Sequence, residues 1–180
     1  MAADHILVTY ATVYGSTREV AEAVAETLRE GDLEVDLHDV RAVRDLGAYG
    51  GVVLGAPLYI GHLHKAARTF LSEHQAALAE VPVALFALGP TGAGDAEEEW
   101  QAVREALNAD LAQYPWLKPI AVELFGGKYD PSRLNLPHRL LALLPASPLH
   151  NAPASDLRDW DAIRAYACSL APVLQAGARA

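Results

Sequence analysis

Cysteine is almost absent from this sequence of 180 residues, in which Cys168 is the only one. A single cysteine excludes an intrachain disulfide and a cysteine cluster for zinc or iron–sulfur. Long apolar runs are also lacking, since none approaches the roughly 20 residues that span a bilayer. The N-terminus shows no cationic segment followed by an apolar core. We therefore expect no signal peptide, no membrane span and a cytoplasmic protein.

Positive charge is scarce as well. Fourteen lysines and arginines stand against twenty-three aspartates and glutamates, so the net charge at pH 7 is −9. Nucleic-acid binding requires a concentrated basic face, and docking to an anionic lipid surface requires basic clusters. The composition therefore argues against both and fits a soluble protein, or one whose partners are basic. The 52% of hydrophobic residues excludes a disordered chain, and the length fits one domain over residues 1–180.

Short apolar runs alternate with segments of helical periodicity along the chain. The predicted strands cover residues 6–10, 34–38, 51–55, 83–88 and 120–125. The predicted helices cover residues 16–29, 64–78, 95–111 and 159–174. Such alternation is typical of βαβ units. We therefore predict an α/β fold, in which a doubly wound, five-stranded parallel sheet carries helices on both faces. Alternating polar and apolar residues place 34–38 at an edge of the sheet, and Pro57 is expected to close the strand 51–55.

The segment 131–155 departs from this pattern. It is rich in proline, with five of the eleven prolines of the chain. Within it, residues 133–144 could form a short helix, because their leucines at 136, 140, 143 and 144 share a face. We interpret the segment as an irregular crossover, or alternatively as a flap that faces a partner or a substrate.

Ligands of doubly wound folds lie beyond the carboxyl ends of the strands, near the switch in strand order. The first loop at that edge is 12–17, where three hydroxyl residues surround Gly15 at the start of a helix. Backbone N–H groups and the partial positive charge of a helix N-terminus favour a phosphate there. The loop matches neither the P-loop nor the dinucleotide pattern and has no lysine. It therefore suits a monophosphate that is held rather than transferred, although a simple capped helix start also fits.

Two further loops are expected at the same edge. The loop 55–62 carries Tyr59, which could stack on a flat ring and leave its hydroxyl in water. The loop 88–95 carries three glycines, which allow the backbone to approach a ligand closely. Taken alone, Tyr59 could simply cover the end of the sheet. The loop 88–95, taken alone, could be a flexible turn. The fold brings all three loops together, which favours a binding site.

These loops resemble those of the flavodoxin family over most of the chain. The resemblance implies a flavodoxin-like fold and a flavin mononucleotide (FMN) whose phosphate is held by residues 12–17. It also implies that Tyr59 stacks on the flavin ring and that residues 89–92 approach the pyrimidine edge of the ring. The implied cofactor-binding residues are Thr12, Val13, Tyr14, Gly15, Ser16, Thr17, Pro57, Leu58, Tyr59, Ile60, Gly61, Gly89, Pro90, Thr91 and Gly92.

Within the family, residues 61–66, 125–129 and 158–163 resemble the branch that includes menaquinone-dependent protoporphyrinogen oxidase. That branch carries a basic segment after the fourth strand, whereas residues 95–99 here are acidic. This acidic stretch is either a solvated helix start or a docking patch for a basic redox partner. We expect no metal site and assign no catalytic residue.

Three functions compete on these observations. The first is an FMN-binding electron carrier, and the alternative is a flavin-dependent oxidoreductase that acts on protoporphyrinogen or a quinone. The third is a receiver or binding module without flavin. It is disfavoured because Thr12 and Ala56 stand where a phosphoacceptor receiver needs acidic residues.

Overall fold

The computed structural model describes residues 5–89, 97–147 and 150–177. Its strands are β1 (His5–Tyr10), β2 (Glu34–Asp39), β3 (Gly51–Tyr59), β4 (His62–Leu63), β5 (Val83–Leu88), β6 (Ala121–Phe125), β7 (Lys128–Tyr129) and β8 (Ser155–Asp156). Its helices are α1 (Ser16–Glu30), α2 (Lys65–Glu73), α3 (Gln75–Leu78), α4 (Glu97–Leu111), α5 (Leu136–Ala142) and α6 (Trp160–Gly177), and η1 (Pro131–Arg133) is a short 3₁₀ turn.

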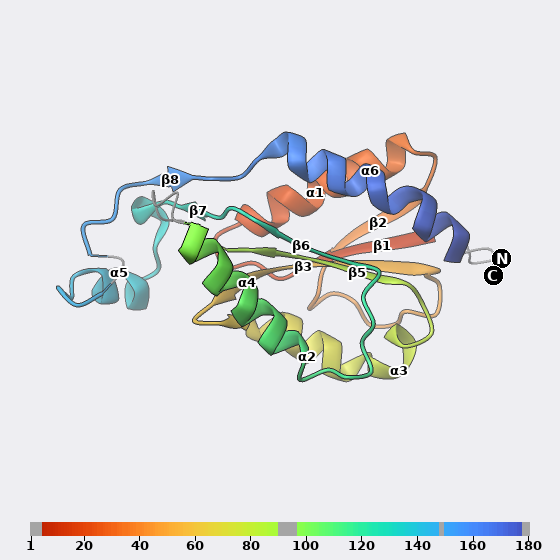
Figure 1. The fold of residues 1–180 in the computed structure, drawn as a ribbon, viewed down its shortest axis with the longest axis horizontal. Coiled ribbons are helices and arrows are strands. Elements are labelled where there is room, and N and C mark those ends of the chain that lie inside the picture. Colours follow the sequence, from red (N-terminus) through yellow and green to blue (C-terminus); the bar gives the residue numbers. More distant parts are fainter. Residues whose placement is uncertain (1–4, 90–96, 148–149, 178–180) are drawn as a thin grey trace.

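The central sheet has five parallel strands in the order β2-β1-β3-β5-β6. Helices α1 and α6 cover one face, and α2, α3 and α4 cover the other (Figure 1). The predicted doubly wound α/β fold is therefore confirmed, including the edge position of β2. The sheet also has a sixth, two-residue strand, because β4 pairs antiparallel with the end of β3.

Strand β3 is longer than the sequence predicts. It runs through Pro57 to Tyr59 and then turns back into β4, so Pro57 does not close it. The reason lies in the neighbouring strand: the pairing of β1 with β3 ends at Tyr10 and Gly55. At Pro57 the strand no longer pairs with β1, so no N–H of residue 57 is required there, and the Pro57 carbonyl oxygen accepts from His64 N at 3.0 Å instead.

Two hydrophobic cores lie on the two faces of the sheet, and β1 contributes to both. Its Ile6 and Val8 belong to the core beneath α1 and α6, whereas Leu7 belongs to the core above α2 and α4. Successive side chains of a strand point to opposite faces, so a strand covered on both faces reads as one continuous apolar run. This is why β1, β3 and β5 were recognisable in the sequence.

Other predicted boundaries moved by a few residues. The predicted helix 64–78 is divided at His74 into α2 and α3. Part of the segment 131–155 forms η1 and α5, and β8 at its end pairs antiparallel with β7.

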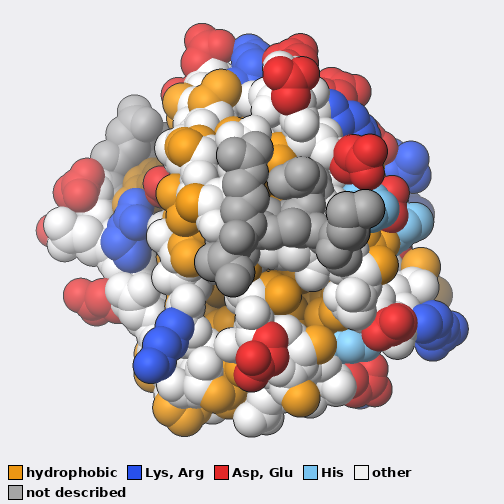
Figure 2. Space-filling view, turned by 90° about the vertical axis from the view of Figure 1, so that its right-hand side faces the viewer, with side chains coloured by type: hydrophobic (Ala, Val, Ile, Leu, Met, Phe, Trp, Pro, Cys, Tyr) orange, Lys and Arg blue, Asp and Glu red, His pale blue; other side chains and the backbone are white. Residues whose placement is uncertain are grey.

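Within the described residues, no helix combines the length and the apolar character that crossing a membrane requires. Figure 2 views the end at which the parallel strands begin, where acidic and basic side chains are interspersed.

Gly55 lies where β3 passes beneath the ring of Phe86. A Cβ at Gly55 would lie 2.1 Å from Phe86 Cζ, and Phe86 is only 1% exposed. We therefore expect Gly55→Ala to lower the free energy of unfolding by about 2–3 kcal/mol, measured by urea denaturation. Gly47→Ala is the matched control, since its methyl would meet only the Asp45 carboxylate at 3.4 Å.

The cause of that loss can be checked in the same assay. Phe86→Leu makes room for the added methyl, so the double variant should be less destabilised than the sum of the two single variants. Strict additivity would show that the collision with Phe86 is not the cause.

Candidate functional site

The loop 12–17 begins directly after β1 and ends at the N-terminus of α1. Thr12 Oγ1 accepts a hydrogen bond from Gly15 N at 2.9 Å. Gly15 has a φ of +89°, a left-handed conformation that favours glycine, and it occupies the N-cap position of α1 without a side chain to cap it. Helix α2, by contrast, is capped by His64 Nδ1. The first N–H groups of α1 are thus left for another acceptor.

Thr17 lies in the first turn of α1, and its side chain is completely buried. Its Oγ1 has no hydrogen-bond partner among the described residues. A buried hydroxyl without a partner costs about 1–3 kcal/mol. Together with the uncapped helix N-terminus, this hydroxyl fits a site for an oxygen-rich anion such as a phosphate.

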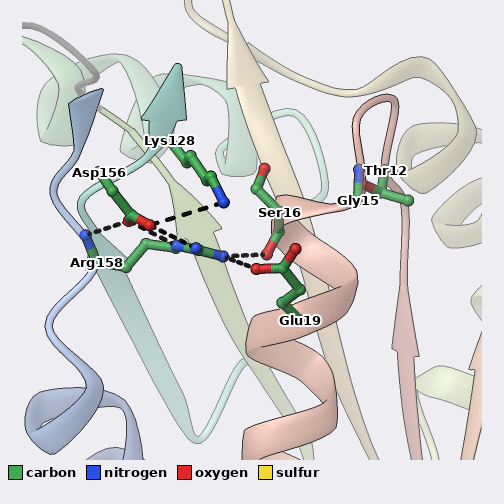
Figure 3. Close-up of polar contacts among 7 residues, drawn as sticks. All are labelled: Thr12, Gly15, Ser16, Glu19, Lys128, Asp156 and Arg158. Atoms are coloured by element: carbon green, nitrogen blue, oxygen red, sulfur yellow. Dashed lines mark hydrogen bonds and ion pairs between the residues drawn. The ribbon is translucent and has the colours of Figure 1, made fainter. Parts of the chain in front are cut away.

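Arg158 brings a positive charge to the same helix, although it is separated from Ser16 by 142 residues. Its side chain is only 3% exposed and donates to Glu19 Oε2 at 2.6 Å and to the carbonyl oxygen of Ser16 at 3.4 Å. Nε and Nη2 donate to the two carboxylate oxygens of Asp156, at 2.8 and 2.6 Å. Figure 3 shows the guanidinium between Asp156 and the first turn of α1. The segment before α6 is thereby fixed to the loop.

Lys128 joins this network from β7. Its Nζ lies 3.9 Å from Asp156 Oδ2, and Figure 3 shows the side chain on the Ser16 side of β7. Two cations, Lys128 and Arg158, therefore balance the carboxylates of Glu19 and Asp156 next to the helix N-terminus. Sequence reasoning placed no cation near the loop, because the loop itself has none. Lys128 and Arg158 lie in the segments 125–129 and 158–163, whose resemblance to a family branch was noted in the sequence, but that resemblance assigned neither of them to the loop.

The residues expected in the second loop form a hairpin. Pro57 and Leu58 belong to β3, and the turn between β3 and β4 consists of Ile60 and Gly61 with φ values of +49° and +78°. Two positive φ values are typical of a type I′ turn, which a β-branched residue adopts only under strain. Ile60 is 99% exposed, so no packing within the described residues offsets that strain.

Tyr59, the last residue of β3, is 41% exposed at this edge. Partial burial raises the pKa of Tyr59 to about 12, so its phenol stays neutral near pH 7. Its ring lies edge-on to that of His64. The neighbouring His62 does not face this side, because its Nδ1 lies 2.7 Å from Asp110 Oδ1 on α4. The contact between His62 and Asp110 therefore attaches the turn between β3 and β4 to helix α4.

The third predicted loop is described only at its start. Gly89 N donates to the carbonyl oxygen of Phe125 at 2.9 Å, which ties the end of β5 to β6 at the carboxyl edge. Pro90, Thr91 and Gly92 lie outside the described residues. The structure thus places residues 12–17, 57–61 and 89 at one edge of the sheet, where β1 and β3 flank the switch in strand order.

A cavity of about 690 Å³ lies on the other side of the loop 12–17, between the end of β2 and the start of α2. This volume is within the usual range for small-molecule sites. Its lining combines three cationic side chains, one carboxylate, two hydroxyl residues and an apolar floor: Thr12, Val13, Val40, Arg41, Val43, Arg44, His64, Lys65, Ala66, Thr69, Phe70 and Glu73.

The cations of this cavity differ in their partners. Arg41 is engaged, since Nη2 donates to the carbonyl oxygen of Thr12 at 3.2 Å and Nε lies 3.2 Å from Asp39 Oδ1. Arg44 and Lys65 have no ion pair within the part of the chain that is described. Burial lowers the pKa of His64, which favours its neutral form. The cavity therefore suits an anion attached to an apolar body. Among the described residues, no group of three or more histidine, cysteine or acidic side chains could hold a metal.

Comparison with known proteins gives a consistent assignment of the fold. The family described as the flavodoxin domain matches residues 7–146. Among curated proteins, the protoporphyrinogen IX dehydrogenase [quinone] of Escherichia coli is 31% identical over 84 residues. That match covers 46% of this chain and 46% of the relative, so the chain spans less than half the length of the curated relatives it matches.

Solved structures show the same fold at low sequence identity. A flavodoxin variant from Pseudomonas aeruginosa is 15% identical with a TM-score of 0.57, and the match covers 95% of this chain and 99% of that one. The rubredoxin oxygen:oxidoreductase of Desulfovibrio gigas is 16% identical with a TM-score of 0.55, over 98% of this chain but only 37% of that one. At such identities the likeness shows the fold alone.

The network around Arg158 makes part of the stability depend on pH. The hydrogen bonds from Arg158 hold the pKa of Asp156 below its ordinary value of 3.8. A carboxyl whose pKa is lowered by folding stabilises the protein while it is ionised, and this contribution is lost as the pH falls through the lowered pKa. We expect Asp156→Asn to be less stable than the wild type near pH 7, with a difference that shrinks below about pH 4.

Urea denaturation between about pH 7 and about pH 3 measures this difference. Asp161→Asn is the control, because Asp161 is 95% exposed and, among the described residues, forms an ion pair only with Arg164. A difference between the wild type and Asp156→Asn that stays constant over the whole range would contradict the assignment.

Proposed function

The chain belongs to the flavodoxin family, whose domain covers residues 7–146, and from this membership we propose that it binds FMN non-covalently and carries electrons through it. The observation that carries the proposal is the buried, unpartnered hydroxyl of Thr17 beside the uncapped N-terminus of α1. A bound flavin supplies the redox chemistry, while the protein supplies binding, orientation and electrostatics.

The phosphate of FMN would lie at the start of α1. The hydroxyls of Thr12, Ser16 and Thr17 and the first N–H groups of the helix would hold it, and the helix dipole favours its charge. Glu19 alone would repel a phosphate there. Arg158 binds that carboxylate at 2.6 Å, so the cation neutralises the repulsion. Lys128 on β7 adds a further positive charge at the same place.

The flavin ring would lie against the hairpin between β3 and β4. Tyr59 offers a half-exposed neutral ring for stacking, and the exposed Ile60 offers apolar contact. We assign the pyrimidine edge of the ring to residues 89–92, of which only Gly89 is described. The acidic character of the protein, with a net charge of −9, raises the free energy of a reduced, anionic flavin and lowers its potential.

As a carrier, the protein would exchange electrons with basic partner proteins in the cytoplasm. Its net charge of −9 attracts such partners over a distance. Three glutamates in the first turn of α4, Glu97, Glu98 and Glu99, provide a local docking patch near the carboxyl edge of the sheet.

Thr17→Val tests the phosphate site. Removing an unpartnered buried hydroxyl should raise the free energy of unfolding of the flavin-free protein by about 1 kcal/mol. The same change should weaken FMN binding about ten-fold, because the lost hydrogen bond is to a charged group. Riboflavin lacks the phosphate, so its affinity should stay unchanged. Fluorescence titration with both flavins measures the difference.

Thr27→Val is the matched control on the same helix. The hydroxyl of Thr27 already donates to the carbonyl oxygen of Ala23 at 2.9 Å, so its loss should leave both flavin affinities unchanged. An equal loss of FMN and riboflavin affinity in Thr17→Val would exclude the phosphate assignment. A purified protein that is colourless and binds no added FMN would overturn the proposed function itself.

The cationic cavity favours a second candidate, a flavin-dependent oxidoreductase acting on protoporphyrinogen or a quinone. The relative in Escherichia coli is a protoporphyrinogen IX dehydrogenase [quinone]. A porphyrinogen is an apolar macrocycle with carboxylate arms, and the cavity presents Arg44 and Lys65 above an apolar floor. Thr12 lines the cavity and also belongs to the phosphate loop, so the two sites adjoin.

The double variant Arg44→Ala/Lys65→Ala tests this candidate in the FMN-loaded protein. We expect its affinity for protoporphyrin, which carries two carboxylates, to fall about ten-fold while the FMN affinity stays the same. Lys118→Ala/Arg164→Ala removes the same charge elsewhere and serves as the control. Equal effects of both double variants would exclude a specific cavity. Turnover of protoporphyrinogen with a quinone under exclusion of oxygen must exceed that of free FMN.

A further inference from the structure

Asp110 is a buried carboxylate one residue before the end of α4, and its side chain is completely inaccessible to solvent. Burial of a carboxylate is costly, and the partial negative charge of a helix C-terminus adds to that cost. Among the described residues, its one ion-pair partner is His62, and no lysine or arginine pairs with it. Gln113 Nε2 donates to Oδ1 at 3.3 Å. Buried ionic groups of this kind can fix one arrangement of their neighbours.

The carboxylate oxygens of Asp110 bind the first two residues after the turn between β3 and β4. Oδ2 accepts a hydrogen bond from Leu63 N at 2.9 Å, and Oδ1 lies 2.7 Å from His62 Nδ1. The next N–H along the strand, that of His64, donates to the carbonyl oxygen of Pro57 in β3. Because successive N–H groups of a strand point to opposite sides, the N–H of Leu63 points away from β3. Asp110 thus takes the place of a further strand beside β4.

The turn has few other attachments. Strand β4 has only two residues, and so short a hairpin is at best marginally stable alone. Ile60 holds a φ of +49°, which strains a β-branched residue, and its side chain is 99% exposed. A Cβ at Gly61 would meet only Ala106 of α4, at 3.7 Å. Within the part of the chain that is described, the hydrogen bonds that join the turn to α4 are those to Asp110.

Both described loops at the carboxyl edge are attached to an element outside the sheet. The hydroxyl of Tyr14, in the loop 12–17, is hydrogen-bonded to His138 Nδ1 of α5. The turn between β3 and β4 is attached to α4 through Asp110. Tyr59, which directly precedes this turn, is the residue that offers its ring to the flavin. The place at which the flavin ring would be held therefore depends on a carboxylate that lies outside the hairpin.

We propose that Asp110 is a positioning residue of the flavin site, which acts through His62 and Leu63 to hold the turn against which the flavin ring lies. This role rests on the proposed function, since its consequence is a change in flavin affinity. Asp110 is completely buried, so it acts only through its neighbours. A turn that is already ordered costs less to bind, which raises the affinity for the ring. The contribution concerns the ring and not the phosphate, so FMN and riboflavin should gain from it equally.

Asp110→Leu in the full chain tests the role, because leucine has the branched shape of aspartate without its acceptor oxygens. We expect the affinities for FMN and riboflavin to fall by the same factor, about ten-fold, in fluorescence titrations. In the flavin-free chain, the amide of Leu63 should exchange with solvent about ten-fold faster. The amide of Val53, in the buried middle of β3, should keep its exchange rate. NMR spectroscopy measures both amides.

Glu105→Leu is the matched control, because it makes the same change at an exposed position of α4 and should alter neither affinity nor exchange. Two variants of His62 test the transmission. His62→Ala should weaken binding of both flavins about three-fold. His62→Asn should restore it, since asparagine Nδ2 takes the position of histidine Nδ1 and donates to Asp110. An equal loss in the two variants would contradict the role of His62.

A fall in FMN affinity alone, unchanged affinities for both flavins, or equal effects of Asp110→Leu and Glu105→Leu would overturn the proposal. Faster exchange at Val53 as well as at Leu63 would also overturn it, because it would show a loss of overall stability. A wild type that binds neither flavin would count against the proposed function. The exchange rate of the Leu63 amide would then still decide whether Asp110 holds the turn.

Discussion

Burial of both faces of the parallel sheet is the constraint on which the rest of the molecule depends. Strands β1, β3 and β5 are almost completely buried. Three connections return through helices on one face or the other, β1 to β2 through α1, β3 to β5 through α2 and α3, and β5 to β6 through α4, whereas β2 reaches β3 through the helix-free segment 40–50. All carboxyl ends then meet at one edge. Between β1 and β3 the strand order reverses, and the chain leaves toward α1 on one face and α2 on the other. The loop 12–17 and the β3–β4 hairpin lie at that divergence, which is where ligands of doubly wound folds bind.

The parts of this arrangement that the sequence predicted are those with local causes. The apolar run of β1 and the helical spacing of α1 each reflect burial of the segment itself. The turn at Gly15 was also readable, because hydroxyls around a glycine at a helix start have a local geometry. The extension of β3 through Pro57 could not be predicted from the sequence, because it depends on where the neighbouring strand β1 ends. Nor was the contact of Arg158 with Glu19, which joins residues 139 positions apart.

Two features at the site reduce stability where no stabilising role is visible. Ile60 holds a positive φ in an exposed turn, and Thr17 holds a buried hydroxyl without a partner. Strained backbone and unpaired polar groups persist in proteins mainly where function requires them. Arg158 contacts the first turn of α1, in which Thr17 lies, and pairs with the carboxylates of Glu19 and Asp156. These ion pairs stabilise the edge of the sheet that carries the unpaired hydroxyl.

The contact between Tyr14 and His138 has a consequence of its own, because it joins the loop 12–17 to helix α5, two segments more than a hundred residues apart. A ligand that moves Tyr14 would change the free energy with which the Tyr14–His138 contact attaches α5 to the loop 12–17. A partner that binds α5 would, through the same contact, change the free energy of ligand binding at the loop. Thermodynamic linkage makes these effects equal in size. A ligand at the loop 12–17 and a partner at α5 would therefore change each other's affinity through this one hydrogen bond.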